Sequence, residues 1–460
     1  MKKQLLCGLI GLLSAQAALG LDLVESYEKA LSYDSGIAAA AASLDAQEAS
    51  SDVTRSALLP QIGAYGNANH YDVDGPNQDN SYKSFSYGVQ LSQPLFQADA
   101  WFAYDAAQFQ TEAARAEYNL AQQQLILDVA EAYFNVLRAA DTLTATEAAE
   151  NAIQRQYEQA QERFDVGLIA ITDVYESRAS FDDATSRRIA AENDLDIARE
   201  RLSRLTGEYA EDLEYLEQDF PLMQPSPADP QKWETTALEQ NWQIETAIRQ
   251  LQASKANLEE AKAGHYPTVE LTASLGRQRL DNVELSTPTL SGQRDGTTTE
   301  GVIGLSVNVP LYAGGGIQAG VRQQRATVDV RDNNLATTRR DVRVNTRSLY
   351  RTVNTNIETA SALKQTIVSR RSALDATLAG YDVGTRNIVE VLDAEQAYYV
   401  ALRDYANARY DYVINSLSLK QSAGTLSPQD IIELNKWLSE TAPGIEALAN
   451  GEETLDDPAR

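Results

Sequence analysis

The residues that most often carry out chemistry in proteins are scarce in this sequence. Histidine occurs only at His70 and His265, and the single cysteine, Cys7, lies close to the N-terminus. A zinc cluster or a two-histidine metal site would have to be built from this very small stock. No G-x-S-x-G motif accompanies either histidine, so a serine hydrolase has no recognisable nucleophile. We therefore expect no enzymatic activity, no cofactor and no metal site.

A glycine run at residues 314–316 is the one segment that resembles a phosphate-binding loop. It follows a segment with strand character and precedes one with helical character, as such loops do. It lacks the Gly-Lys-Ser/Thr ending, however, so phosphate binding is not predicted. The run instead indicates a chain reversal between a strand and a helix, because glycine tolerates the backbone angles of tight turns.

The charge of the chain excludes one class of partner. Its 66 acidic residues exceed its 39 lysines and arginines, which gives a net charge of −27. A surface this acidic repels nucleic acid and suits the passage or attraction of cations. Simple solubility explains the same total equally well.

Residues 1–20 have the layout of a secretory signal peptide, with two lysines, an apolar run and then small residues. The apolar run, residues 5–13, is too short to cross a bilayer, which takes about 20 residues. No later stretch approaches 18 consecutive apolar residues. We expect the mature chain to begin near Leu21 and to reach the periplasm or beyond.

Two copies of one unit follow in tandem. Residues 164–167, Phe-Asp-Val-Gly, return 217 positions later as Tyr-Asp-Val-Gly at 381–384, and Gly207 and Gly424 keep the same offset. The predicted organisation is therefore a first repeat, a proline-rich linker, a second repeat and a C-terminal segment with an acidic, flexible tail, at residues 21–220, 221–230, 231–435 and 436–460.

Each copy is expected to place one β-hairpin between helices. The hairpins are predicted at residues 59–96 and 266–312, the second with a longer loop at 282–298. Continuous helices are predicted before them at 21–57 and 231–263. Much longer ones should follow, because glycine and proline are rare from 98 to 164 and from 317 to 381. Each of these long helices would span about 100 Å.

The predicted strands are about ten residues long and alternate strictly, as a tilted membrane strand does. Alternation of this kind also fits a soluble sheet with one wet face. On the membrane interpretation, one face of the second strand meets lipid through Phe85, Tyr87, Val89 and Leu91. Four strands cannot close a barrel in lipid, so several copies must pool them, and a dimer, trimer or tetramer would all serve.

These features resemble the TolC outer-membrane efflux family over residues 21 to about 435. The most specific matching segments are residues 58–61, 133–137, 163–174, 381–394 and 407–410. The resemblance implies a mixed α+β membrane protein: a homotrimer with a 12-stranded outer-membrane β-barrel, four strands per chain, continued by a long periplasmic barrel of helical coiled coils. Its function would be to carry drugs or secreted proteins across the outer membrane.

The resemblance also assigns roles to residues near the two Val-Gly turns. The turns would be periplasmic tips that contact an adaptor protein through Val166, Gly167, Leu168, Val383, Gly384 and Thr385. A polar network would close the tip at rest, with Tyr381 and Arg386 on one coil bonded to Thr172 and Asp173 on another. Glu390 and Asp393 would form an acidic ring in the bore, although the family has aspartate at the position of Glu390.

The implied partners are two further copies of the chain, outer-membrane lipid, a periplasmic adaptor (membrane fusion) protein and an inner-membrane ABC or RND-type transporter. No nucleic acid is expected. The alternative function is a non-conducting periplasmic tether or scaffold. A tether explains the long helices, but it does not explain alternating strands long enough to cross lipid.

Overall fold

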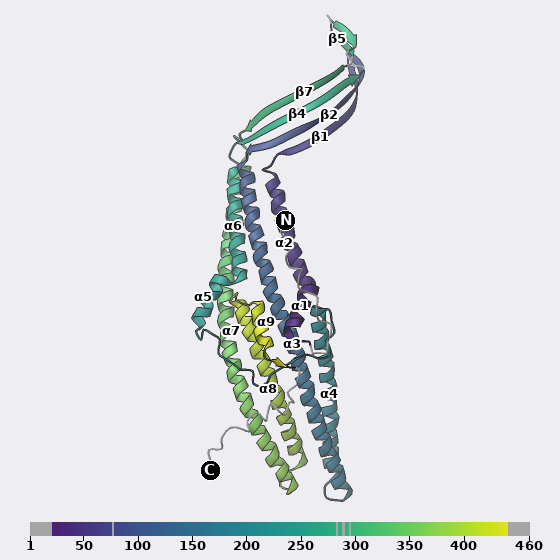
Figure 1. The fold of residues 1–460 in the computed structure, drawn as a ribbon, viewed down its shortest axis with the longest axis vertical. Helices are drawn as coiled ribbons and strands as arrows, with labels where there is room; N and C mark the ends of the chain where they lie inside the picture. The colour runs from purple at the N-terminus through teal and green to yellow at the C-terminus, as the bar shows by residue number, and fades with distance from the viewer. Residues whose placement is uncertain (1–20, 76–77, 282–283, 288–289, 294–295, 440–460) are drawn as a thin grey trace, which may run out of the picture. The chain divides into compact units, whose positions relative to one another are not determined.

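The computed structural model describes residues 21–75, 78–281, 284–287, 290–293 and 296–439 (Figure 1). The predicted signal peptide and the acidic tail lie outside these residues. The chain forms two compact units. One is largely helical and contains residues 21–40, 119–242 and 339–439 of the described chain, and the other carries the main sheet and contains residues 41–118 and 243–338 as far as described.

Two very long helices each contain residues of both units. They are α3 (Ala98–Asp165) with 68 residues and α7 (Gly316–Asp382) with 67, close to the predicted ranges. In the helical unit, α4 (Ile171–Thr206) follows α3 and α8 (Ile388–Ser422) follows α7 as hairpin partners (Figure 1). Among the described residues, no helix combines the length and the apolar character that a membrane span requires.

The apolar seam predicted on α3 forms part of the core of the helical unit. Val129 and Tyr133 are fully buried, as is Leu137 one turn later. The Tyr133 hydroxyl donates a hydrogen bond to the Glu214 carbonyl at 2.7 Å, which satisfies its polar end. The spacing of three and four residues thus predicted the buried face.

The two shorter helices predicted as continuous are each broken, so that prediction was wrong. The first consists of α1 (Leu23–Tyr33) and α2 (Ser35–Ser56), and the second of α5 (Pro230–Gln240) and α6 (Trp242–Ala263). Asp34 and Asn241 separate them.

Both separating residues have extended backbones, and hydrogen bonds close the helix before each of them. The Asp34 N–H donates to Ala30 and closes α1, while its carboxylate accepts the Ile37 N–H at 2.9 Å and starts α2. The Asn241 N–H donates to the Ala237 carbonyl at 3.1 Å and closes α5, while its side-chain amide donates to the distant Ser422 carbonyl at 2.9 Å. Capping of this kind competes with helix continuation.

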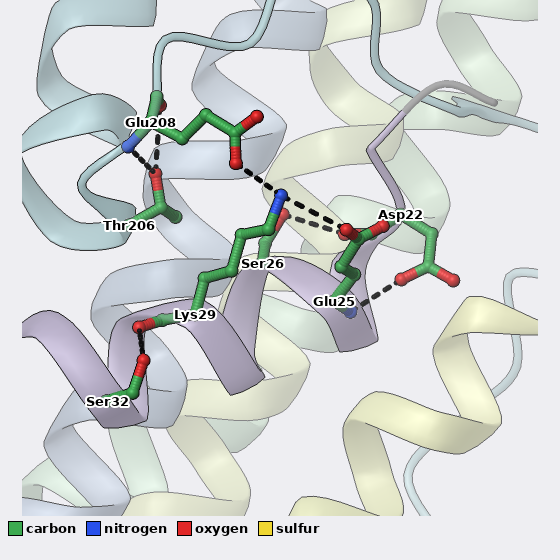
Figure 2. A network of polar contacts seen from close by, with 7 residues as sticks. All are labelled: Asp22, Glu25, Ser26, Lys29, Ser32, Thr206 and Glu208. Carbon is green, nitrogen blue, oxygen red and sulfur yellow. Dashed lines mark hydrogen bonds and ion pairs between the residues drawn. The ribbon is translucent and has the colours of Figure 1, made fainter. Parts of the chain in front are cut away.

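Helix α1 is fixed against the end of α4 by a polar network (Figure 2). Asp22 caps α1 by accepting the Glu25 N–H at 2.6 Å. The Lys29 ammonium lies 3.0 Å from the Glu25 carboxylate and 2.5 Å from that of Glu208, just after α4. These contacts join the start of the described chain to the first helical hairpin.

The linker between the copies has no regular structure before α5. Tyr412 of α8 holds it, since its hydroxyl donates to the Met223 carbonyl at 2.7 Å and accepts the Met223 N–H at 3.1 Å. Nearby, β3 (Tyr215–Leu216) pairs with β8 (Leu438–Ser439), and α9 (Pro428–Asn435) precedes β8. The start of the predicted C-terminal segment thus pairs with the end of the first copy.

The main sheet has four antiparallel strands in the order β1-β2-β4-β7 (Figure 1). They are β1 (Gln61–Gly75), β2 (Gln78–Phe96), β4 (Thr268–Asp281) and β7 (Gly296–Asn308). With 13 to 19 residues, they exceed the predicted ten. The alternation of apolar and polar residues ends where both faces become polar. The backbone pairing continues beyond that point, because it does not depend on apolar side chains.

The loop predicted at 282–298 also differs from expectation. Part of it forms a second ribbon, β5 (Glu284–Thr287) paired with β6 (Leu290–Gln293), and β7 begins within it at Gly296. Residues 282–283, 288–289 and 294–295 lie outside the described part. The ribbon was missed because its polar composition is typical of loops.

Candidate gate and membrane face

The two hairpin turns of the helical unit have the same backbone conformation. In the first, the N–H groups of Gly167 and Leu168 donate to Phe164 and Arg163, both at 2.8 Å. Gly167 has a φ of 76°. This is the Schellman ending of a helix, which requires a left-handed residue and therefore favours glycine.

The second turn repeats these bonds. The Gly384 N–H donates to Tyr381 at 3.0 Å and the Thr385 N–H donates to Gly380 at 2.8 Å, and Gly384 has a φ of 75°. The glycine of the repeated Val-Gly motif is therefore a geometric requirement of both turns.

Large aliphatic side chains project from both turns into solvent. Val166, Leu168 and Val383 are 71%, 73% and 75% exposed. Gly167, Gly384 and Thr385 are exposed as well. Exposed apolar residues on a fixed turn are suited to contact with another protein. The adaptor role of all six residues stays a prediction.

Tyr381 is buried beside the second turn. It is 8% exposed and belongs to an apolar cluster with Ile153, Ile388 and Val391, drawn from α3, α7 and α8. The Arg163 guanidinium lies 4.8 Å from the centre of its ring and bonds the Asp382 carboxylate at 2.9 Å. Arg163 thus connects the first hairpin to the second through a cation–π contact and an ion pair.

Arg386 and Glu390 form an ion pair at the start of α8, with 2.6 Å between Nη1 and Oε2. Asn387 caps this helix by accepting the Glu390 N–H at 2.9 Å, and it donates to the Glu390 carboxylate at 3.0 Å. One chain therefore holds Arg386 and Glu390 together, two residues that were predicted to act separately.

The remaining predicted gate residues lie on α4 and α8. The Thr172 hydroxyl donates to the neighbouring Asp173 carboxylate at 3.3 Å. Asp393, one turn beyond Glu390, is exposed and lines a cavity of about 100 Å³ that Asp183 and Arg187 also line. Bonds from Tyr381 or Arg386 to Thr172 or Asp173 stay predictions for the assembled protein.

Sequence reasoning missed Glu395, a carboxylate on the buried face of α8. It is 7% exposed, and Oε2 has no hydrogen-bond partner among the described residues. Burial raises the pKa of Glu395 to about 7, although the charge of Arg155 opposes this shift. Its spacing of four residues from Val391 and three from Leu392 could have revealed it, because an acid on an apolar stripe is unusual.

Glu395 should make the stability of the protein depend on pH. Its pKa is raised from 4.5 to about 7 in the folded chain, so the folded state binds more protons between these values. Stability should therefore fall as pH rises from about 4.5 to about 7. Glu395→Gln should remove this fall and add up to about 3 kcal/mol per chain at pH 8. Denaturant unfolding at pH 5 and pH 8 measures the effect.

The exposed Glu358→Gln on α7 is the matched control and should keep the dependence seen in wild type. If Glu395→Gln and Glu358→Gln lose equal stability between pH 5 and pH 8, the assignment to Glu395 is wrong.

The sheet register gathers apolar residues on one face over part of the sheet. Phe85, Tyr87 and Val89 alternate on β2 and are 42%, 57% and 50% exposed, and Leu91 follows in the same alternation. Cross-strand pairing places further apolar residues on this face, namely Ile62, Ala64, Ala273, Leu275, Ile303, Leu305 and Val307. The opposite face includes Ser84, Ser86, Gln90 and Ser92. Val89 and Leu91 therefore have apolar neighbours on both adjacent strands, whereas Phe85 and Tyr87 pair with Arg279 and Arg277 on β4.

Comparison with known proteins places the chain in a family. The sequence pattern of the family described as "Outer membrane efflux protein" matches residues 26–208 and again residues 233–425. The chain belongs to this outer membrane efflux family. The predicted resemblance and the predicted outer-membrane location are thereby confirmed, and the protein is an efflux channel of the outer membrane.

Relatives and solved structures of the efflux family agree with this assignment. The chain is 37% identical to outer membrane protein TolC of Escherichia coli, over 95% of this chain and 90% of that protein. It is 28% identical to the alkaline protease secretion protein AprF of Pseudomonas aeruginosa, over 93% and 89%. The fold matches the CmeC outer membrane channel of Campylobacter jejuni with a TM-score of 0.74 and 18% identity, over 93% and 95%.

Proposed function

We propose that three copies of this efflux protein close a 12-stranded barrel in the outer membrane and continue it as a helical tunnel into the periplasm. The main sheet carries the proposal. Among the described residues, β1 and β7 each pair along one edge only. An open edge in lipid leaves backbone groups without partners, so β1 of one copy would pair with β7 of the next.

The two faces of the sheet support this arrangement. The apolar face, with Val89, Leu275 and Ile303, would meet lipid, and the face with Gln90 and Ser274 would line a wet lumen. Outer-membrane barrels alternate in this way, with apolar residues outward and polar residues inward. Three copies are preferred over two or four on the resemblance to the TolC family.

The long helices and their turns would form the periplasmic part. The exposed Val166, Leu168 and Val383 would contact a periplasmic adaptor, which would connect the tunnel to an ABC or RND-type transporter of the inner membrane. The tunnel would then carry small molecules, secreted proteins or both. The name of AprF concerns protease secretion, which makes secreted proteins a specific candidate cargo.

The acidic ring would act on ions in the bore. Glu390 and Asp393 from three chains would supply six carboxylates, with each Glu390 already paired to its own Arg386. The negative charge that no arginine neutralises would then come mainly from the exposed Asp393. Crowded carboxylates attract cations, so the channel should prefer them.

Planar-bilayer recording of the detergent-purified protein tests the proposal. Wild-type trimers should conduct and prefer cations, and Glu390→Ala/Asp393→Ala should lower that preference because it removes the ring. Glu358→Ala, on the exposed surface of α7, should leave selectivity unchanged. A trimer without conductance would favour the tether, and a monomer soluble without detergent would exclude both the barrel and the trimer.

A further inference from the structure

One cross-strand row of the main sheet combines a large ring with two glycines. Tyr65 on β1 pairs with Gly88 on β2, and Gly88 pairs with Gly276 on β4. All three lie on the face opposite Val89, which is the lumen face in the proposed barrel. Tyr65 is 37% exposed, so part of its ring is covered.

The Tyr65 side chain extends across β2 as far as β4. A methyl group on Gly276 would lie 2.6 Å from the Tyr65 hydroxyl oxygen and 3.7 Å from Cζ. A methyl group on Gly88 would lie 2.9 Å from the same hydroxyl. The ring therefore lies along the sheet over positions where any other residue would place a side chain.

The two glycines are needed for different reasons. A methyl group on Gly88 would also lie 2.6 Å from the Leu275 carbonyl and 2.8 Å from Gly276 Cα, so the close approach of β2 and β4 itself requires glycine there. At Gly276 the one contact under 3.0 Å is the Tyr65 hydroxyl, and the glycines with positive φ do not include it. Gly276 is thus a recess for the tip of Tyr65.

We propose that Gly276 determines the open width of the barrel lumen, because it lets the Tyr65 ring lie against the sheet. This inference rests on the proposed barrel and adds a size-determining position to it. With alanine at 276, the 2.6 Å contact forces the ring off the sheet, and the lumen is the open side. Three copies would then project three rings inward, so bulky cargo would be excluded before small ions.

A cysteine reporter measures the width independently of the periplasmic gate. The sequence has no cysteine beyond Cys7, which lies in the predicted signal peptide. Thr272→Cys places a thiol on the same face, four residues from Gly276 toward the start of β4 and the helices. Maleimide-polyethylene glycols of increasing size, added outside intact cells, should label it up to a size limit set by the bore.

Gly276→Ala should lower this size limit, and Tyr65→Ala/Gly276→Ala should restore it. Gly63→Ala is the control, because it adds a methyl group to the same face at an ordinary 3.7 Å from Gln90 and should leave the limit unchanged. If Gly276→Ala does not assemble, Tyr65→Trp replaces it, since the wider ring cannot lie in the recess and should lower the limit as well, while Tyr65→Phe should not.

The outcomes separate the inference from the proposed function. If assembled Gly276→Ala or Tyr65→Trp trimers keep the wild-type limit, the role of Gly276 is wrong and the barrel stands. If even the smallest maleimide fails to label Thr272→Cys in an otherwise wild-type chain from outside, the proposed lumen is refuted. The inference about Gly276 is then refuted as well.

Discussion

Val89→Arg is expected to prevent most of the protein from assembling in the outer membrane. Val89 is 50% exposed on the apolar face, where it pairs with Ala64 of β1 and Leu275 of β4. A guanidinium facing the middle of the bilayer should cost about 2–4 kcal/mol per copy, and a trimer carries three. The yield of heat-resistant trimer in isolated outer membranes measures the loss.

Ser86→Arg is the matched control for this substitution. Ser86 lies on the same strand but on the opposite face, where a charged side chain would reach the wet lumen. The Ser86→Arg variant should assemble at close to the wild-type yield. Equal loss for both variants, or equal retention, would contradict the assignment of the two faces.

The second large effect is expected at the tip, where Tyr381→Phe/Arg386→Ser should open the channel without an adaptor. In the proposed assembly, each copy would lose polar bonds worth about 0.5–3 kcal/mol each, repeated three times. The resting population should then shift toward the open state, with a larger single-channel conductance. Phenylalanine keeps the ring that Arg163 covers, so the apolar cluster should survive.

Tyr157→Phe/Arg370→Ser is the control, because it makes the same two types of substitution away from the tip. Tyr157 stacks on Phe181 at 6.2 Å and Arg370 is exposed on α7, both in the same helical unit. This variant should conduct like wild type. A Tyr381→Phe/Arg386→Ser channel that also conducts like wild type would refute the gate roles of both residues.

The long elements could be predicted from the sequence because their signals are extended. Glycine and proline are rare over the whole of α3, and its ends at Ala98 and Asp165 fall within one residue of the prediction. The alternation from Ser84 to Ser92 placed β2 and its apolar face. In both cases many residues contribute to one signal, so no single side chain decides it.

The missed features each depend on one residue or on contacts distant in sequence. Asp34 ends a helix through its own carboxylate, and Asn241 is held by Ser422, which lies 181 positions away. Glu395 lies on the buried face of α8, and within the sequence only its spacing from Val391 and Leu392 indicated this burial. The ion pair between Arg386 and Glu390, four residues apart, was not predicted, while bonds from Arg386 to Thr172 and Asp173 on another coil stay predictions.

The helix breaks at Asp34 and Asn241 also bear on how the chain originated. They stand 207 positions apart, which is the offset between Pro60 and Pro267 at the ends of the same helix pairs. A break at the same place in both copies is what duplication of one half-length ancestor would produce. Six copies of that half-length ancestor would supply the same twelve strands now proposed for three chains. After a duplication the two turns could diverge: the N-cap residue of α8 is Asn387, whose side chain caps the helix, and the N-cap residue of α4 is Ala170, whose side chain cannot.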